Sequence, residues 1–209
     1  MTGTRDDAPP TRRRRSDARR SIDAILDAAR TLLGERPDAS VEDIATAAGV
    51  SRQTVYAHFP SRDALVAALV DAARAEGLAA VDAACLDAAP PADALSRFLD
   101  ISWQLLGRYP LLLDPALNRA PRLDGSDPHL AVTDLLERLI RRGQNSGDFD
   151  RTLSAGWLAA AILELGHTAA EHVAAGRLTT GEAMAVLLES SLRLCGGRPR
   201  KSGTPGPTY

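Results

Sequence analysis

Short blocks of apolar side chains with helical spacing alternate with polar segments over the first third of the chain. The first block consists of Ile22, Ile25, Leu26, Ala29 and Leu33. This spacing gives one continuous apolar stripe and predicts a helix over about residues 17–34. The second block consists of Val41, Ile44, Ala45 and Ala48. It predicts a shorter helix with one buried face, capped at its start by Ser40 with Asp43 in a capping-box arrangement.

A glycine follows the second predicted helix, and a third helix begins directly after it. Gly49 can adopt the left-handed conformation that a sharp helix exit needs, Val50 can fill the corner, and Ser51 can cap the next helix. In that helix Val55 and Phe59 lie four positions apart and point inward. The opposite face carries Arg52, Gln53, Tyr56 and Ala57. The pattern predicts two short helices about a tight turn, with a polar face exposed on the second.

A short rigid helix with such a face is typical of proteins that read the major groove of DNA. Arg52 has the chemistry to pair with guanine, and Gln53 with adenine. Tyr56 and His58 are then expected to contact phosphates or thymine methyl groups and to fix the register. The alternative is an ordinary helical hairpin whose tyrosine and histidine only pack or hydrate.

The order of these elements resembles the DNA-binding region of the TetR family of bacterial regulators. The resemblance rests on the Gly-Val-Ser turn at 49–51, on x-Val-Tyr-x-His-Phe at 54–59 and on Ser-Arg-Asp-Ala-Leu at 61–65. It covers about Ser16 to Ala72. The sequence departs from the family at Gln53, where a small residue is frequent, and at Ala57, where a longer or charged one is frequent. These departures leave the preferred operator sequence open.

The resemblance also extends the set of candidate DNA contacts. It implies that Ser40 contacts a phosphate and that the helix capped by Ser61 connects the reading helix to a larger domain. Arg62 lies in the first turn of that helix, near where a backbone phosphate is expected to pass. The candidate DNA-contacting residues are Ser40, Ser51, Arg52, Gln53, Thr54, Tyr56, His58 and Arg62.

The charge of the chain restricts where nucleic acid can bind. The formal net charge is −2 over 209 residues, so any contact with DNA must be local. Residues 11–20 hold six arginines against one aspartate. Residues 1–15 lack apolar periodicity and are expected to be disordered, either as an arm along phosphates or the minor groove or as a solvated tail. No apolar run approaches the length of a membrane span and no signal-peptide region is visible, which predicts a cytoplasmic protein.

The rest of the chain remains helical in pattern but carries no motif. Helices are predicted over 93–108, along a stripe from Val132 to Ile140, over 153–175 and over 180–195. We therefore expect an all-α protein with an N-terminal three-helix helix-turn-helix domain and a C-terminal helical domain. The expected divisions are a disordered Arg-rich arm (1–15), the DNA-binding domain (16–60), a connecting helix with the ligand-binding and dimerisation domain (61–195), and a disordered tail (196–209).

The helix expected over 153–175 is apolar almost all round, which a helix on a monomer surface rarely is. We expect it to pack both on its own subunit and on a second copy of the chain. The resemblance implies a four-helix dimer interface with the last two helices of each subunit. Two reading helices one duplex turn apart, about 34–36 Å, match a pseudo-palindromic operator.

Polar side chains in that helix share a sector with Trp157. One interpretation makes them the polar groups of a ligand pocket, and the other makes them the wet stripe of the helix. The candidate pocket residues are Phe98, Trp103, Leu106, Trp157, Glu164 and Thr168.

The sequence offers little support for catalysis, a metal or a cofactor. Glu164-x-x-His167 is half of a di-iron pattern, but that site needs a second such motif and further carboxylates. Cys85 and Cys195 are far apart and lie in no metal-type spacing, so we expect free thiols that act as small apolar residues. We assign no catalytic residue, no metal ligand and no cofactor.

Together these features predict a homodimeric transcriptional repressor that binds operator DNA and is released by a small-molecule inducer. One alternative is a ligand-independent regulator or an activator. Another is a small-molecule-binding protein whose DNA-binding head is vestigial.

Overall fold

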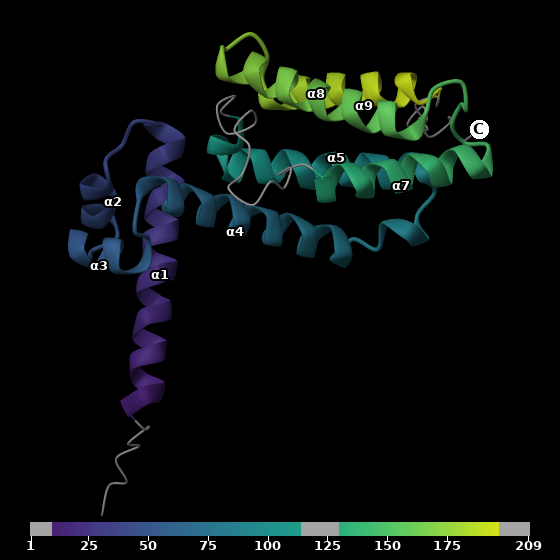
Figure 1. Cartoon of the computed structure of the whole chain (residues 1–209). Helices are drawn as coiled ribbons and strands as arrows, with labels where there is room; N and C mark the ends of the chain where they lie inside the picture. The colour runs from purple at the N-terminus through teal and green to yellow at the C-terminus, as the bar shows by residue number, and fades with distance from the viewer. Residues whose placement is uncertain (1–9, 114–129, 197–209) are drawn as a thin grey trace, which may run out of the picture. The chain divides into compact units, whose positions relative to one another are not determined.

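The computed structural model describes residues 10–113 and 130–196, and within these ranges the regular structure is helical throughout (Figure 1). The expected all-α fold is confirmed. The chain divides into two compact units, which we describe separately. Unit 1 combines the chain up to Ala75 with Arg108–Leu112, and unit 2 combines Glu76–Gly107 with the chain from Leu113 onward.

Unit 1 contains three N-terminal helices and the beginning of a fourth. Their bounds are α1 Pro10–Glu35, α2 Val41–Ala47, α3 Arg52–His58 and α4 Arg62–Ala83. The unit is closed by fully buried apolar residues from all four helices, namely Ile25, Ala29, Ile44, Val55, Leu65 and Leu69. The predicted stripe of α1 is confirmed at its centre, while Ile22 and Leu26 at its edges are half-buried.

Helix α1 begins at Pro10 rather than near Asp17, so residues 10–15, which we assigned to the disordered arm, are helical. Proline is tolerated in the first turn because its missing N–H has no partner there, and arginine is a good helix former. The apolar pattern did not predict this extension, because residues 10–15 carry no apolar stripe. Residues 1–9 of the arm and 197–209 of the tail lie outside the described residues.

The part of unit 1 that comes from later in the chain packs against α1. Tyr109 and Leu111 are buried, with exposed fractions of 6% and 7%. The Arg30 guanidinium lies 5.7 Å from the centre of the Tyr109 ring, a cation–π arrangement. Pro110 lies so close to Gly34 that a Cβ at that glycine would be 3.2 Å from the proline ring. The short 3₁₀ helix η2, Pro110–Leu113, thus begins on the surface of α1.

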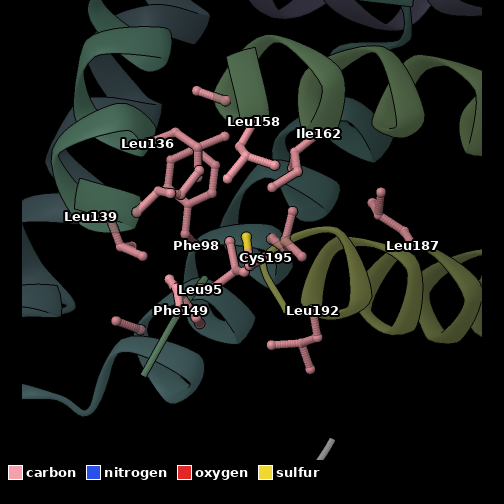
Figure 2. Close-up of a cluster of buried hydrophobic side chains, with 14 of the residues drawn as sticks. Leu95, Phe98, Leu136, Leu139, Phe149, Leu158, Ile162, Leu187, Leu192 and Cys195 are labelled. Carbon is pink, nitrogen blue, oxygen red and sulfur yellow. The ribbon is translucent and has the colours of Figure 1, made fainter. Parts of the chain in front are cut away.

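Over its described residues, unit 2 contains the end of α4 and four further α-helices, which follow the 3₁₀ helix η1 Leu86–Ala88. Their bounds are α5 Pro91–Arg108, α7 Leu130–Ser146, α8 Ala155–Ala174 and α9 Thr180–Leu194. Helix α8 packs against both α7 and α9. Figure 2 shows the core between these helices, where Leu95 and Phe98 of α5 meet Leu136 of α7, Leu158 and Ile162 of α8, and Cys195. The sequence placed the last two helices within two residues of these bounds.

Polar groups hold the connection between α7 and α8. Gln144 is buried, and its Nε2 donates to the carbonyls of Asp150 and Leu153 at 2.8 Å. Arg151 returns to the end of α7 by donating from Nε to the Gln144 carbonyl at 2.6 Å. With these bonds in place, α7 continues to Ser146, six residues beyond the end of the predicted stripe at Ile140.

The two cysteines are free thiols in different surroundings. Cys195 is fully buried, and burial raises the pKa of its thiol to about 11, so it acts as the small apolar residue we predicted. Cys85 is exposed, which contradicts that role for this residue, and it takes a left-handed conformation with φ +47° where α4 turns into η1. Over the described residues, no helix combines the length and the apolar character needed to cross a membrane.

A substitution at Gly143 tests how tightly α7 packs against the segment between α7 and α8. A Cβ at this position would lie 2.3 Å from the Phe149 ring, closer than atoms can approach, and Phe149 is itself buried. We expect Gly143→Ala to lower the free energy of unfolding by about 1–3 kcal/mol through overpacking, measured by urea denaturation at fixed protein concentration. Gly107→Ala in α5 is the control, because among the described residues no atom lies within 4 Å of its Cβ position. The control should gain about 0.5–1 kcal/mol from helix propensity, and equal effects of the two substitutions would contradict this packing.

Candidate nucleic-acid interface

The first helix of the predicted motif is anchored by the capping box at Ser40. The Ser40 Oγ accepts from the Asp43 N–H at 3.1 Å, and the Ser40 N–H donates to Asp43 Oδ2 at 2.9 Å. The serine hydroxyl also donates to the same carboxylate oxygen at 2.8 Å. Hydrogen bonds from Ser40 hold the pKa of Asp43 below its usual value of 3.8. These bonds fix the start of α2 and confirm the predicted cap.

The turn between α2 and α3 has the predicted geometry. Gly49 has φ +67°, and the Val50 N–H donates to the Ala45 carbonyl at 3.0 Å, which closes the end of α2. Ser51 caps α3, since its Oγ accepts from the Thr54 N–H at 3.1 Å. The Ser51 and Thr54 hydroxyls lie 2.8 Å apart. Both side chains therefore set the first turn of α3.

Helix α3 has two faces, as the sequence predicted. Val55 is 1% exposed and the adjoining Phe59 is 8% exposed, so one side is buried in unit 1. The opposite side consists of Arg52, Gln53, Tyr56 and Ala57, all exposed. We call these four residues the reading face. They present a guanidinium, an amide and a phenol on one short helix whose start is fixed by its cap.

Two side chains lie next to the guanidinium of Arg52. Its Nη1 lies 3.6 Å from Oε2 of Glu42 on α2, and its guanidinium carbon lies 5.4 Å from the centre of the Tyr56 ring. Hydrogen bonding to Tyr56 raises the pKa of Arg52 above its usual value, so the side chain remains a cation. Glu42 is not among the residues predicted from the sequence. Its position in the first turn of α2 is typical of a residue that only complements the helix dipole.

The remaining candidate DNA contacts lie around this face with partners of their own. His58 is half-buried, and its ring meets that of Phe59 edge-on at 6.4 Å. Arg62 is exposed at the start of α4 and donates to the carbonyl of Pro37. Ser40 is exposed beside Asp43. The structure thus places Arg52, Gln53 and Tyr56 together on one exposed face, with the other candidates in capping or packing roles.

The reading face lies within a segment that matches known proteins. Residues 25–69 match the family model of the bacterial regulatory proteins, tetR family. The HTH-type transcriptional repressor LfrR of Mycolicibacterium smegmatis is 40% identical over 77 residues, which are 37% of this chain and 41% of LfrR. The HTH-type transcriptional regulator EthR of Mycobacterium tuberculosis is 50% identical over 50 residues, 23% of each chain. The match therefore spans less than half the length of these relatives.

A solved structure extends the likeness to the whole fold. The TetR-like regulator LfrR from Mycobacterium smegmatis, in complex with proflavine, superposes with a TM-score of 0.64 and 25% identity. The superposition covers 84% of this chain and 96% of that one. Residues 25–69 thus carry a TetR-family DNA-binding region, and the whole fold is like that of TetR-like regulators. Both likenesses agree with the resemblance carried by the turn and the reading face.

The candidate pocket residues of unit 2 fall into two groups. Phe98 is in the core, with Trp103 and Leu106 half-buried on the same helix, α5. Trp157 is 64% exposed, and Glu164 and Thr168 are exposed on the same side of α8. A single chain does not bring these six side chains together. The second group is exposed in the single chain, and the α5 residues remain candidates for a pocket.

Helices α8 and α9 also carry exposed large apolar residues. Trp157 and Val186 have exposed fractions of 64% and 53%, and Leu194 at the end of α9 is also exposed. Near them, Glu164 Oε2 lies 3.8 Å from His167 Nδ1. Over the part of the chain that the structure describes, no cluster of three or more potential ligands could hold a metal ion.

The capping box of α2 predicts a specific dependence of stability on pH. Because the pKa of Asp43 is lowered in the folded state, its contribution is present above the unfolded value and is lost as pH falls through the folded value. We expect Asp43→Asn to reduce the loss of thermal stability between about pH 6 and pH 3. Asp23→Asn, at an exposed position of α1, is the matched control and should retain the wild-type loss. An unchanged pH dependence in Asp43→Asn would show that the box does not stabilise the folded state.

Proposed function

We propose that the protein is a homodimeric transcriptional repressor that binds a pseudo-palindromic operator and is released by a small-molecule inducer. The observation that carries the proposal is the reading face, with Arg52, Gln53 and Tyr56 exposed on a helix whose other side is buried. Long donors and acceptors near the start of such a helix reach base edges in the major groove. In this proposal Arg52 and Gln53 read bases, and Tyr56 and Arg62 contact the phosphate backbone.

The dimer in this proposal is formed by α8 and α9. Exposed large apolar groups on these two helices, Trp157, Val186 and Leu194, are the kind of surface that a second subunit covers. A two-fold axis through this surface gives each dimer two reading faces. Two faces separated by one duplex turn, about 34–36 Å, fit a pseudo-palindromic site.

Release by an inducer is supported by the path of α5. This helix carries the candidate pocket residues Trp103 and Leu106, and its last residue, Arg108, already belongs to unit 1. The next residue, Tyr109, is buried against α1. A ligand that displaces α5 therefore acts on a segment covalently continuous with the head. The similar LfrR was solved with proflavine bound, which supports a small molecule as effector. Linkage requires the operator to weaken inducer binding by the same factor.

Substitutions on the reading face test DNA binding. Arg52→Ala and Tyr56→Ala are each expected to weaken binding to DNA from immediately upstream of the gene by about five- to a hundredfold, the range for loss of one base or backbone contact. Fluorescence anisotropy against a scrambled competitor, over a series of salt concentrations, measures the effect. Arg97→Ala removes an exposed arginine of α5 in unit 2 and is the control. If all three variants bind like the wild type, or if the wild type binds every sequence equally, the proposal fails.

A charge in the exposed apolar surface tests the dimer. We expect Trp157→Glu to shift the protein from dimer to monomer in sedimentation equilibrium, because a buried unpaired carboxylate is costly. Leu78→Glu is the control, since Leu78 is also exposed and apolar, at 38%, but lies on α4. Helical circular dichroism should persist in both variants. A wild-type protein that is monomeric at all concentrations would overturn this interface.

A further inference from the structure

Glu42 presents a negative charge beside the reading face. Its side chain is 74% exposed, and it comes from α2, whereas the reading face belongs to α3. DNA phosphates repel a carboxylate at this place, so Glu42 lowers the affinity of unit 1 for any duplex. The neighbouring Asp43 already supplies the cap and the negative charge at the start of α2. Stabilisation of the helix is therefore a weak explanation for a second carboxylate.

The contact that Glu42 makes points to a different role. Its Oε2 lies 3.6 Å from Nη1 of Arg52, and the Tyr56 ring lies 5.4 Å from the guanidinium carbon. The carboxylate and the ring thus approach the guanidinium from two elements of the motif. Together these contacts favour a subset of the rotamers of the arginine side chain. Arg52 is 61% exposed all the same, so part of the guanidinium remains available to a ligand.

An arginine on a reading helix has two kinds of partner on DNA. It can pair with a phosphate, which carries no sequence information, or it can donate both bonds of its planar fork to the O6 and N7 of guanine. An unrestrained side chain reaches either partner. A carboxylate near one nitrogen of the guanidinium repels phosphate, and the 61% exposure of the side chain leaves the rest of the planar group available to guanine.

From this geometry we propose that Glu42 is a positioning residue that sets the sequence specificity of Arg52. It holds the guanidinium for a guanine edge and opposes its pairing with phosphate. The protein gives up affinity for DNA in general and gains discrimination for guanine at one position of each half-site. This inference rests on the proposed function, since it requires that unit 1 binds DNA through the reading face.

The test uses the full-length protein and a duplex that the wild type selects from a random-sequence pool. Affinities are measured for that duplex, for its single base-pair variants and for a scrambled duplex, over a series of salt concentrations. We expect Glu42→Gln to bind the scrambled duplex severalfold more tightly and to lose about tenfold in discrimination at one guanine position. The salt dependence on scrambled DNA should become steeper by up to about 0.9, the effect of one added phosphate contact.

Two controls separate positioning from a general change in charge. Glu35→Gln removes an exposed carboxylate at the end of α1 in the same unit and should leave the discrimination unchanged. Glu42→Asp keeps the charge on a shorter side chain and should restore part of the discrimination. In the Arg52→Ala background, Glu42→Gln should no longer alter discrimination at that base pair, because its effect passes through the arginine.

The outcomes distinguish this inference from the function on which it rests. If the wild type selects no sequence, the proposed function fails and the inference fails with it. If the wild type selects a sequence but Glu42→Gln discriminates as the wild type does, only the inference is overturned. If Glu42→Gln changes discrimination equally with and without Arg52, Glu42 contacts a base itself, and the positioning role is wrong.

Discussion

The two-sidedness of α3 is the constraint on which the rest of unit 1 depends. A helix of seven residues is too short to be stable alone in water, so α3 persists because Val55 and Phe59 are buried and Ser51 caps its start. Burial of one side fixes which residues face outward. The caps at Ser40 and Ser51 and the left-handed Gly49 then fix how α3 leaves α2. This rigidity favours contacts between these side chains and base edges, because less conformational entropy is lost on binding.

Features that depend on residues close together in the sequence could be predicted, whereas features that depend on distant residues could not. The capping box at Ser40, the glycine turn and the apolar stripes each depend on residues a few positions apart, and the structure confirms the box, the turn and the centre of the first stripe. The start of α1 was not predicted, because arginine favours a helix but contributes no apolar stripe to the sequence pattern. The contact of Tyr109 with Arg30 joins distant parts of the chain, and the spacing of apolar residues does not predict such a pair.

The same limit applied to the candidate sites. The exposed face of α3 could be predicted because the period of a helix decides it. The ligand candidates could not be grouped, because Phe98 and Trp157 lie on different helices, and only tertiary packing makes one core and the other exposed. Glu42 was overlooked for a related reason. Its importance comes from its distance to Arg52 on the next helix, and a residue in the first turn of a helix already has an ordinary explanation.

The construction of unit 1 from two chain segments bears on how it can be controlled. Helix α4 carries one of the chain connections between unit 1 and unit 2. Here the chain also returns through Arg108–Leu112, where Tyr109 and Leu111 are buried and Pro110 touches Gly34. Any displacement of residues 108–112 would either break these contacts or move α1 with them. Because the core of unit 1 is shared by α1 and α3, displacement of α1 changes the support of the reading face itself.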